Sequence, residues 1–328
     1  MAKAIALAFL LLLIPALAEA APPRVGVVLP GNEWTSALDG LREGMKELGY
    51  VEGRDVQYLV ESAQSDQRRV VALAEKFKKE KVDLIYTVTN TALKVVAEVT
   101  RATKPAAPPV VFGSASGPVE SRIHPAYATP DTNITGVTSA SIELIGKRLE
   151  MLKELLPHVQ RVALLGDREA ASSIAAFAAA RETAPKLGLT LLEFRVGSRQ
   201  EAIDTARRLT RADTDAMFLL PSLITVGSMT ELAEAARAAK LPFAVYQVEH
   251  VRKQGALLSY GSSYFLQGKQ SAALVDKILK GTPPGRLPIE RPKLHQLILN
   301  VETAAAIGIT FSREALNRAD ELVDSAAK

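Results

Sequence analysis

Short apolar runs alternate with helix-length amphipathic segments along most of this chain. The first run, at 24–30, is followed by a helix that Ser36 is expected to cap and Gly49 to end. Strands that alternate with helices in this way predict right-handed βαβ units and a parallel sheet. Further strands are expected at 56–60, 83–88, 109–112, 161–165, 190–195, 215–220 and 242–246, and helices at 66–80, 90–101, 170–187, 199–211 and 265–280.

The alternation occurs twice, in two halves of similar pattern. Lys-Leu-Gly at 186–188 echoes Glu-Leu-Gly at 47–49, each before a strand. A chain of 328 residues also exceeds what one hydrophobic core usually serves. The expected fold class is therefore α/β, with two doubly wound parallel-sheet lobes joined near 134–142, and with the segments after 259 packed back onto those lobes.

The N-terminus has the pattern of an export signal. Lys3 precedes an apolar run at 4–13, Pro15 breaks that run, and Ala-Glu-Ala at 18–20 forms a small-residue cleavage site. The run is shorter than a bilayer requires. We expect cleavage near Ala20 and a periplasmic protein that begins near Ala21.

The composition limits what such an exported protein can be. Cysteine is absent, which excludes disulfides, thiolate chemistry and the lipid-bearing cysteine of an anchored lipoprotein. The formal net charge is only +4, and the lysines at 76–81 fall in a helix-sized cluster that reads as a solvated helix face. We expect neither a nucleic-acid partner nor a stable membrane anchor, and a monomer is the default.

Motifs for cofactors and catalysis fail at decisive positions. The first strand-to-helix turn, at 30–34, lacks the glycines that a dinucleotide needs, and Ser141 and Ser263 stand where a P-loop needs its first glycine. The stretch 113–117 places Ala115 where a hydrolase needs its nucleophile. The four histidines lack metal-binding spacing. We expect no cofactor, no metal and no catalytic group.

Polar residues follow the carboxyl ends of several expected strands, where parallel sheets bind ligands near helix N-termini. For any single residue, helix capping alone is an alternative, but several such groups on one rim favour a binding site. The candidates are Asn32, Glu33, Trp34, Thr89, Asn90, Thr91, Ser114, Ala115 and Ser116 in the first half, and Asp167, Arg168, Ser222, Thr225, Tyr246, Gln247 and Glu249 in the second.

Four of these candidates carry distinct chemistry. Trp34, the only tryptophan, is a candidate for stacking on a ligand, for a contact between the lobes or for core packing. Asp167 or Glu249 would hold an ammonium group and Arg168 a carboxylate, with surface ion pairs as the alternative.

The order of short motifs resembles the ABC transporter substrate-binding proteins of the family that includes tryptophan- and tyrosine-binding members. The resemblance covers essentially the whole expected mature chain. It is carried by Gly-Leu-Arg-Glu-Gly at 40–44, Glu-Leu-Gly-Tyr-Val-Glu-Gly at 47–53, Lys-Val-Asp-Leu-Ile at 81–85, Asn-Ile-Thr-Gly-Val at 133–137, Arg-Leu-Glu-Met-Leu-Lys-Glu-Leu-Leu-Pro at 148–157, Gln-Gly-Ala-Leu at 254–257, Tyr-Gly at 260–261, Ile-Leu-Lys-Gly at 278–281, Leu-Ile-Leu-Asn at 297–300 and Thr-Ala at 303–304.

That resemblance implies a type I periplasmic binding fold, in which two lobes close on a small molecule. It implies crossings near Ser139 and Tyr260, which divide the chain into lobe one (21–138 and about 261–293) and lobe two (139–260 and about 294–328). It also implies an ABC permease and an ATPase as partners.

Two departures from the family pattern leave the ligand open. Members often carry Thr-Asp-Pro after the fourth strand, where 116–118 reads Ser-Gly-Pro, and a polar pair where Leu223 and Ile224 stand. An aromatic amino acid is thus one candidate among small organic ligands. We interpret the chain as a solute receptor of an importer, with a periplasmic sensor subunit and, less favoured, an enzyme on the same fold as alternatives.

Overall fold

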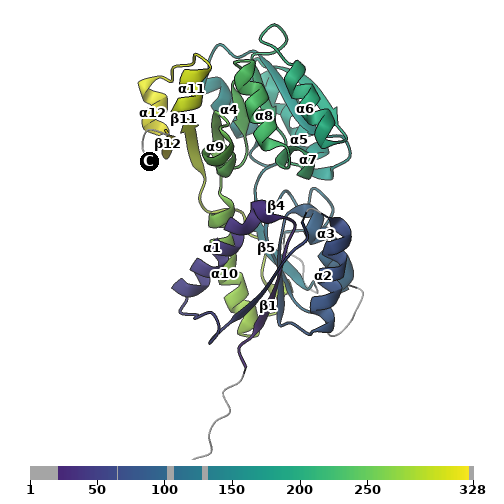
Figure 1. Ribbon diagram of the computed structural model, residues 1–328. Coiled ribbons are helices and arrows are strands. Elements are labelled where there is room, and N and C mark those ends of the chain that lie inside the picture. The colour runs from purple at the N-terminus through teal and green to yellow at the C-terminus, as the bar shows by residue number, and fades with distance from the viewer. Residues whose placement is uncertain (1–20, 65, 102–106, 128–131, 325–328) are drawn as a thin grey trace, which may run out of the picture.

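The computed structural model describes residues 21–64, 66–101, 107–127 and 132–324, so the expected signal peptide at 1–20 lies outside the described residues. The described chain forms two α/β lobes, one above the other in Figure 1. Among the described residues, no helix has the length and hydropathy that a membrane crossing requires.

Lobe one is built on a parallel five-stranded sheet of order β2-β1-β3-β4-β5. Helices α1 and α10 pack together on one face of this sheet, and α2 and α3 cover the other (Figure 1). The strands are β1 (Arg24–Leu29), β2 (Gln57–Ser62), β3 (Leu84–Val88), β4 (Val110–Ala115) and β5 (Ile134–Thr138), and the helices are α1 (Thr35–Glu47), α2 (Gln67–Lys79), α3 (Asn90–Arg101) and α10 (Tyr264–Leu279), with a 3-10 turn η1 at Asn32–Trp34.

Two glycines let α1 and α10 approach each other closely. A Cβ atom on Gly40 would lie 1.9 Å from the carbonyl oxygen of Phe265, and one on Gly268 would lie 1.9 Å from that of Ala37. No side chain larger than hydrogen fits at either position. This contact fixes α10, which follows β10 of lobe two in the chain, onto lobe one.

Lobe two is built on a seven-stranded sheet of order β12-β11-β10-β9-β8-β6-β7. Helices α6, α8 and α9 pack on one face, while α4, α5, α11 and α12 pack on the other (Figure 1). The strands are β6 (Arg161–Asp167), β7 (Thr190–Val196), β8 (Ala216–Leu219), β9 (Phe243–Val245), β10 (Leu258–Gly261), β11 (Gln296–Asn300) and β12 (Glu321–Val323), and the helices are α4 (Ile145–Leu155), α5 (Ala171–Thr183), α6 (Arg199–Arg208), α7 (Leu223–Val226), α8 (Met229–Ala238), α9 (Val248–Gln254), α11 (Val301–Ala306) and α12 (Arg313–Arg318), with a 3-10 turn η2 at Ala184–Leu187. A further 3-10 turn, η3 (Pro284–Arg286), follows α10 and lies beside β5 of lobe one.

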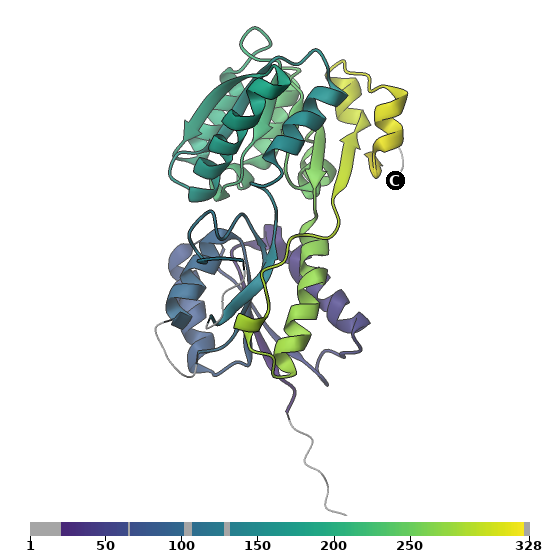
Figure 2. The ribbon, with the colours of Figure 1, turned by 180° about the vertical axis from the view of Figure 1, so that it is seen from behind.

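The chain passes between the lobes three times (Figure 2). It leaves β5 for α4 at 139–144, leaves β10 for α10 at 262–263, and returns from η3 to β11 at 287–295. On the third pass Glu290 lies alongside β5, because its amide nitrogen donates to the carbonyl oxygen of Gly136 over 2.9 Å. We call these three passes the crossings.

The fold differs from the sequence prediction in local detail. Strand β11 pairs antiparallel with β10, and β12 was not expected. The cap of α1 is Trp34, whereas Ser36 lies inside the helix and its hydroxyl has no hydrogen-bond partner among the described residues. The reason is that the η1 turn already begins the helical path before Ser36.

Candidate functional site

A cavity of about 150 Å³ lies between the lobes, at the carboxyl ends of the strands of both sheets. Both lobes contribute to its wall. Its lining residues are Trp34, Thr89, Asn90, Thr91, Ser114, Ser116, Asp167, Ala170, Ser172, Pro221, Ser222, Leu223, Val226, Tyr246, Gln247 and Tyr264.

A second, outer space of about 680 Å³ adjoins this cavity. The two share Asn90, Thr91, Asp167, Ala170 and Ser172, so the inner cavity continues into the outer one between α3 and the start of α5. For scale, an engineered cavity of about 150 Å³ in another protein accommodates benzene. The inner cavity therefore has room for about one ring, and the outer space has room for more.

Two residues of lobe one enter the cavity from left-handed backbone. Thr89 has a φ of 70° and Ser114 a φ of 59°, each at the end of its strand. Left-handed backbone is strained for any residue other than glycine, and more so for β-branched threonine. Because such strain concentrates at functional sites, the ends of β3 and β4 are the candidate ligand-binding part of lobe one.

Asn90 and Ser116 complete the wall of lobe one. The Nδ2 atom of Asn90 donates to the carbonyl oxygen of Ser116 over 2.7 Å and to Ser121 Oγ over 3.0 Å. This ties the start of α3 to the loop after β4. The Oδ1 atom of Asn90 and the Oγ1 atom of Thr89 are buried without a hydrogen-bond partner in the described chain, so they are free to meet a ligand.

Asp167 supplies the only carboxylate among the described residues that line the inner cavity, and no cationic side chain lines it. One oxygen of Asp167, Oδ1, accepts hydrogen bonds from the amides of Glu169, over 2.8 Å, and Ala170, over 3.0 Å. These bonds hold the carboxylate at the end of β6, just before α5. A cationic group of a ligand would meet its charge partner here.

One side chain joins the two lobes inside the cavity. Gln247, at the start of α9, donates from Nε2 to Ser114 Oγ over 3.4 Å. Its Oε1 atom is buried and has no hydrogen-bond partner in the described chain. Gln247 therefore presents an unused acceptor beside a contact that already links the lobes.

Aromatic side chains form the floor of the cavity. Trp34 is 3 % exposed and belongs to a core cluster that also contains Tyr246 and Tyr264. Burial raises the pKa of both tyrosine hydroxyls. These hydroxyls are neutral at physiological pH and can act as hydrogen-bond donors.

Ten of the sixteen sequence candidates line the cavity and a further one, Thr225, lies beneath its wall, where its amide donates to Ser222 Oγ over 3.1 Å. That bond places Ser222 as the cap of α7. The ten are Trp34, Thr89, Asn90, Thr91, Ser114, Ser116, Asp167, Ser222, Tyr246 and Gln247.

The other five candidates lie outside the cavity lining. Asn32 and Glu33 are exposed on the η1 turn, because only the third residue of that turn faces inward. Ala115 is wholly buried within β4. Arg168 points away, forming an ion pair with Glu201.

Glu249 is the fifth of these, and its carboxylate serves the joint between the lobes. Its Oε1 atom accepts the amide of Tyr264 over 2.8 Å, at the start of α10. Burial raises the pKa of the Glu249 carboxyl. Glu249 does not line the cavity. Of the two carboxylates that the sequence offered for an ammonium group, only Asp167 lies in the lining.

Six lining residues were not among the candidates, and most are apolar or small. Tyr264 begins α10 directly after the second crossing, so its position at the cavity depends on how the lobes meet. Leu223 occupies a position where family members often carry a polar residue, and here it gives the cavity an apolar surface. The six are Ala170, Ser172, Pro221, Leu223, Val226 and Tyr264.

No group of His, Asp or Glu residues within the described ranges could hold a metal ion. The chemistry of the cavity is instead that of hydroxyl, amide and aromatic groups around one carboxylate. Such a lining suits reversible binding of a small polar molecule.

Comparison with known proteins agrees with this arrangement. A Tyrosine-binding protein from Clostridioides difficile (strain R20291) is 23% identical over 271 residues, which is 83% of this chain and 76% of that protein. A conserved domain protein from Vibrio cholerae has a TM-score of 0.83 at 25% identity, over 92% of this chain and 99% of that one. A structure from Streptococcus pneumonia described as an ABC domain in complex with L-Trp also has a TM-score of 0.83, at 21% identity, over 92% of this chain and 100% of that one.

The fold is that of type I periplasmic binding proteins. The sequence model of the family described as ABC transporter substrate binding protein matches residues 24–323, which is nearly the whole described chain. The chain belongs to the ABC transporter substrate-binding protein family.

Proposed function

We propose that this protein is the periplasmic solute-binding component of an ABC importer and closes its two lobes around an amino acid or a related carboxylate. The observation that carries the proposal is the polar cavity between the lobes, to which both lobes contribute hydrogen-bonding groups and lobe two contributes one carboxylate. No covalent step is needed for such a function.

The lining suits a ligand that carries both a cation and an anion. Asp167 is placed to receive an ammonium group. On the facing wall, the first amides of α3 and the hydroxyls of Thr89 and Ser116 are suited to a carboxylate. Because no lysine or arginine lines the inner cavity within the described chain, a carboxylate without a cationic group would meet no opposite charge there, and we expect it to bind more weakly than an amino acid.

The apolar part of the cavity suits a ligand side chain. Leu223 and Val226 offer an aliphatic surface, and Trp34 and Tyr246 offer aromatic ones. An aromatic amino acid would place its ring among these residues. The known relative that is described as tyrosine-binding supports this ligand class.

Transport would follow from closure of the lobes. A ligand that contacts both walls stabilises the closed state, since each wall alone offers only part of its contacts. We propose that the permease recognises this closed form and that the ATPase powers transfer. Genes for a permease and an ATPase beside this gene would support import.

Export places the receptor where its ligand is. The N-terminal signal pattern, with cleavage near Ala20, supports a periplasmic location, and the absence of cysteine leaves no lipidation site. N-terminal sequencing of the protein secreted to the periplasm should begin near Ala21. An uncleaved N-terminus in a membrane fraction would contradict this part of the proposal.

Thermal shift across a panel of compounds tests the ligand class. The protein is first unfolded, dialysed and refolded to remove any carried-over ligand, and is then heated with amino acids, aromatic acids, sugars or nucleosides. A ligand that binds only the folded state raises the midpoint by mass action. We expect a rise with amino acids; a rise only with sugars or nucleosides, or with no compound, would contradict the proposal.

Asp167 gives the panel a matched pair of variants. Asp167→Asn should abolish most of the rise, because the neutral amide no longer pairs with an ammonium group. Asp204→Asn changes a half-buried carboxylate on α6 that accepts a hydrogen bond from Gln200 and does not line the cavity, and it should leave the rise intact. Equal rises in the two variants would remove Asp167 from the site.

A further inference from the structure

Arg148 is a charged side chain held in the interior of the molecule. It lies in α4, is 2 % exposed, and is the largest fully buried side chain of the described residues. It forms no direct ion pair among those residues, although the Glu143 carboxylate acts on it electrostatically, and its Nη2 atom has no hydrogen-bond partner there. Burial lowers the pKa of its guanidinium to about 10. Arginine side chains are almost never fully buried unless they are paired, so this buried guanidinium calls for an explanation.

The guanidinium binds the first crossing and the end of the strand that leads into the second. Its Nε atom donates to the carbonyl oxygen of Tyr260 over 2.6 Å, at the end of β10 and just before the second crossing. Its Nη1 atom donates to the carbonyl oxygen of Ser141 over 2.6 Å, within the first crossing. Both segments are thereby attached to α4.

The third crossing reaches the same place. The ring of His295, in the last residues before β11, stacks on the ring of Tyr260 with centroids 6.0 Å apart. The charge of Arg148 also helps to lower the pKa of His295, after the larger effect of burial. The first crossing, the end of β10 that leads into the second, and the third are thus linked through Arg148 and Tyr260; Figure 2 shows the three crossings between the lobes.

A chain of hydroxyl groups joins this junction to the ligand cavity. Ser116, which lines the cavity, lies 3.2 Å from Ser139 through their Oγ atoms. Ser139 in turn donates to Ser141 Oγ over 2.9 Å. The carbonyl of that same Ser141 accepts the bond from Arg148. The wall of the cavity and the clamped segment are thus in direct contact.

We infer that Arg148 is a positioning residue for lobe closure, which clamps the first crossing and the end of β10 to α4 and so restricts bending to the short stretches beyond these two points. Those stretches are 138–140, where Ala140 has a φ of 49°, and 261–263. The inference rests on the proposed hinge closure but needs no particular ligand. A planar guanidinium suits the role because it donates in several fixed directions from one rigid group.

The test measures the distance between the lobes without any ligand. Since the chain has no cysteine, Arg68→Cys on α2 and Gln200→Cys on α6 give two unique, exposed labelling sites on opposite lobes. Spin labels at both sites report the distribution of distances between the lobes when measured by pulsed electron paramagnetic resonance. In this labelled background, Arg148→Met should broaden the distribution and shift it to longer distances, because both carbonyls are released from α4.

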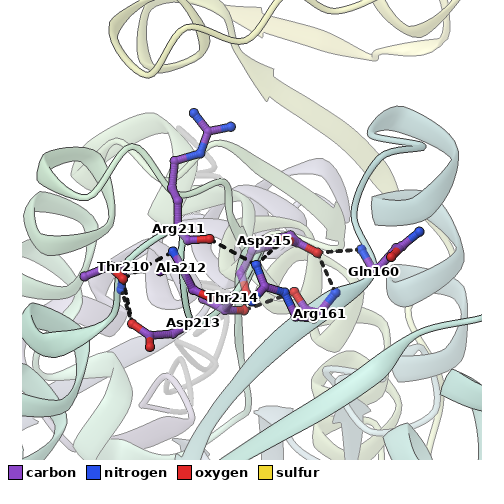
Figure 3. A network of polar contacts seen from close by, with 9 residues as sticks. Gln160, Arg161, Thr210, Arg211, Ala212, Asp213, Thr214 and Asp215 are labelled. Carbon is purple, nitrogen blue, oxygen red and sulfur yellow. Dashed lines mark hydrogen bonds and ion pairs between the residues drawn. The ribbon is translucent and has the colours of Figure 1, made fainter.

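Arg161 provides the matched control. Its guanidinium also donates to backbone carbonyls, those of Arg211 and Ala212, and pairs with Asp215 (Figure 3). All of these residues belong to lobe two, and none lies in the three crossings. Arg161→Met should lower the unfolding midpoint and leave the distance distribution unchanged. This separates a loss of stability from a loss of positioning.

A second variant covers the case in which Arg148→Met does not fold. Arg148→Lys keeps the charge but replaces the fork with a single point donor, so the distribution should still broaden, although less. An Arg148 variant that folds and keeps the distribution of the parent would overturn the inference. Because the readout needs no ligand, its failure is distinct from a failure of the proposed ligand class.

Discussion

Gln247 Nε2 lies 3.4 Å from Ser114 Oγ, so a side chain at the start of α9 in lobe two donates to a hydroxyl at the end of β4 in lobe one. Both residues line the cavity between the lobes. A ligand in this cavity would therefore lie against a bond that already joins the lobes, and would add its own contacts to that bond.

Removing this bond should open the ligand-free protein and weaken ligand binding. A hydrogen bond of this kind contributes about 1 kcal/mol, so Gln247→Ala should raise the dissociation constant of an amino-acid ligand about fivefold. Small-angle X-ray scattering should give a larger radius of gyration for the ligand-free variant. Gln200→Ala, which changes an exposed residue of α6, is the control and should match the wild type. A Gln247→Ala variant as compact as the wild type would contradict this role.

The strained backbone at Thr89 predicts a trade between stability and binding. Glycine adopts a φ of 70° without strain, so Thr89→Gly should raise the free energy of unfolding by up to about 1 kcal/mol. The same change removes an unpartnered hydroxyl from the cavity and should weaken binding. Urea denaturation and calorimetric titration measure the two effects.

Lys240 offers the matched control for that prediction. It has a φ of 53° but is exposed after α8 and does not line the cavity. Lys240→Gly should therefore raise stability and leave the affinity unchanged. If Thr89→Gly lowered stability, or if both variants lost affinity alike, strain at Thr89 would not be a feature of the site.

How much of this molecule the sequence predicts depends on the range of the interactions concerned. The alternation of strands and helices comes from local periodicity, and α3 spans the residues that its pattern predicted. Polar residues after strand ends were found because parallel sheets bring their carboxyl ends to one edge. Ser114 and Asp167 were predicted on this basis, and both line the cavity.

The parts that the sequence missed depend on how distant segments meet. Tyr264 lines the cavity only because α10 returns to lobe one beside Trp34. Arg148 was seen only as part of a motif, since no local pattern reveals a contact with Tyr260, which is 112 residues away. Arg168 and Glu249 could be assigned as binding groups or as structural partners, and only three-dimensional placement distinguished these.

Burial of His250 predicts a specific loss of stability in acid. Burial lowers the pKa of this imidazole to about 3, so the unfolded chain binds a proton near pH 6.5 that the folded protein does not. The contribution of neutral His250 to the free energy of unfolding is therefore present above pH 6.5 and is lost as the pH falls toward 3. Between pH 7 and pH 5 the loss should be about 2 kcal/mol.

A variant separates the contribution of His250 to the pH dependence of stability from the contributions of other groups. His250→Leu removes the titrating ring, so urea denaturation at pH 7 and pH 5 should show a smaller loss of stability in the variant than in the wild type. Parallel losses in the two proteins would mean that His250 titrates normally, and the interior position of this ring beside Tyr246 would then be in doubt.

Glu249 predicts a pH dependence of the opposite sign. Burial raises the pKa of its carboxyl, so its contribution to stability is greatest in acid and is lost as the pH rises through the raised value. Glu249→Gln keeps an acceptor for the amide of Tyr264 and removes the charge. The variant should be more stable than the wild type at pH 8, and this advantage should shrink toward pH 5.

An exposed glutamate gives the comparison for Glu249. Glu234→Gln on α8 changes a solvated carboxylate and should alter stability little at either pH. Unfolding midpoints of the three proteins at pH 8 and pH 5 decide the matter. A Glu249→Gln variant that is less stable than the wild type at pH 8 would show that the ionised carboxylate is needed at the joint between the lobes.

Calorimetric titration of the refolded protein with L-tyrosine, L-tryptophan and L-phenylalanine tests the central claim most directly. We expect saturable binding of at least one of these amino acids at a single site, with the heat of binding largely lost in Asp167→Asn and retained in Asp204→Asn. Absence of saturable binding to all three, in protein that still unfolds cooperatively, would contradict the claim that the cavity between the lobes receives an amino acid of this class.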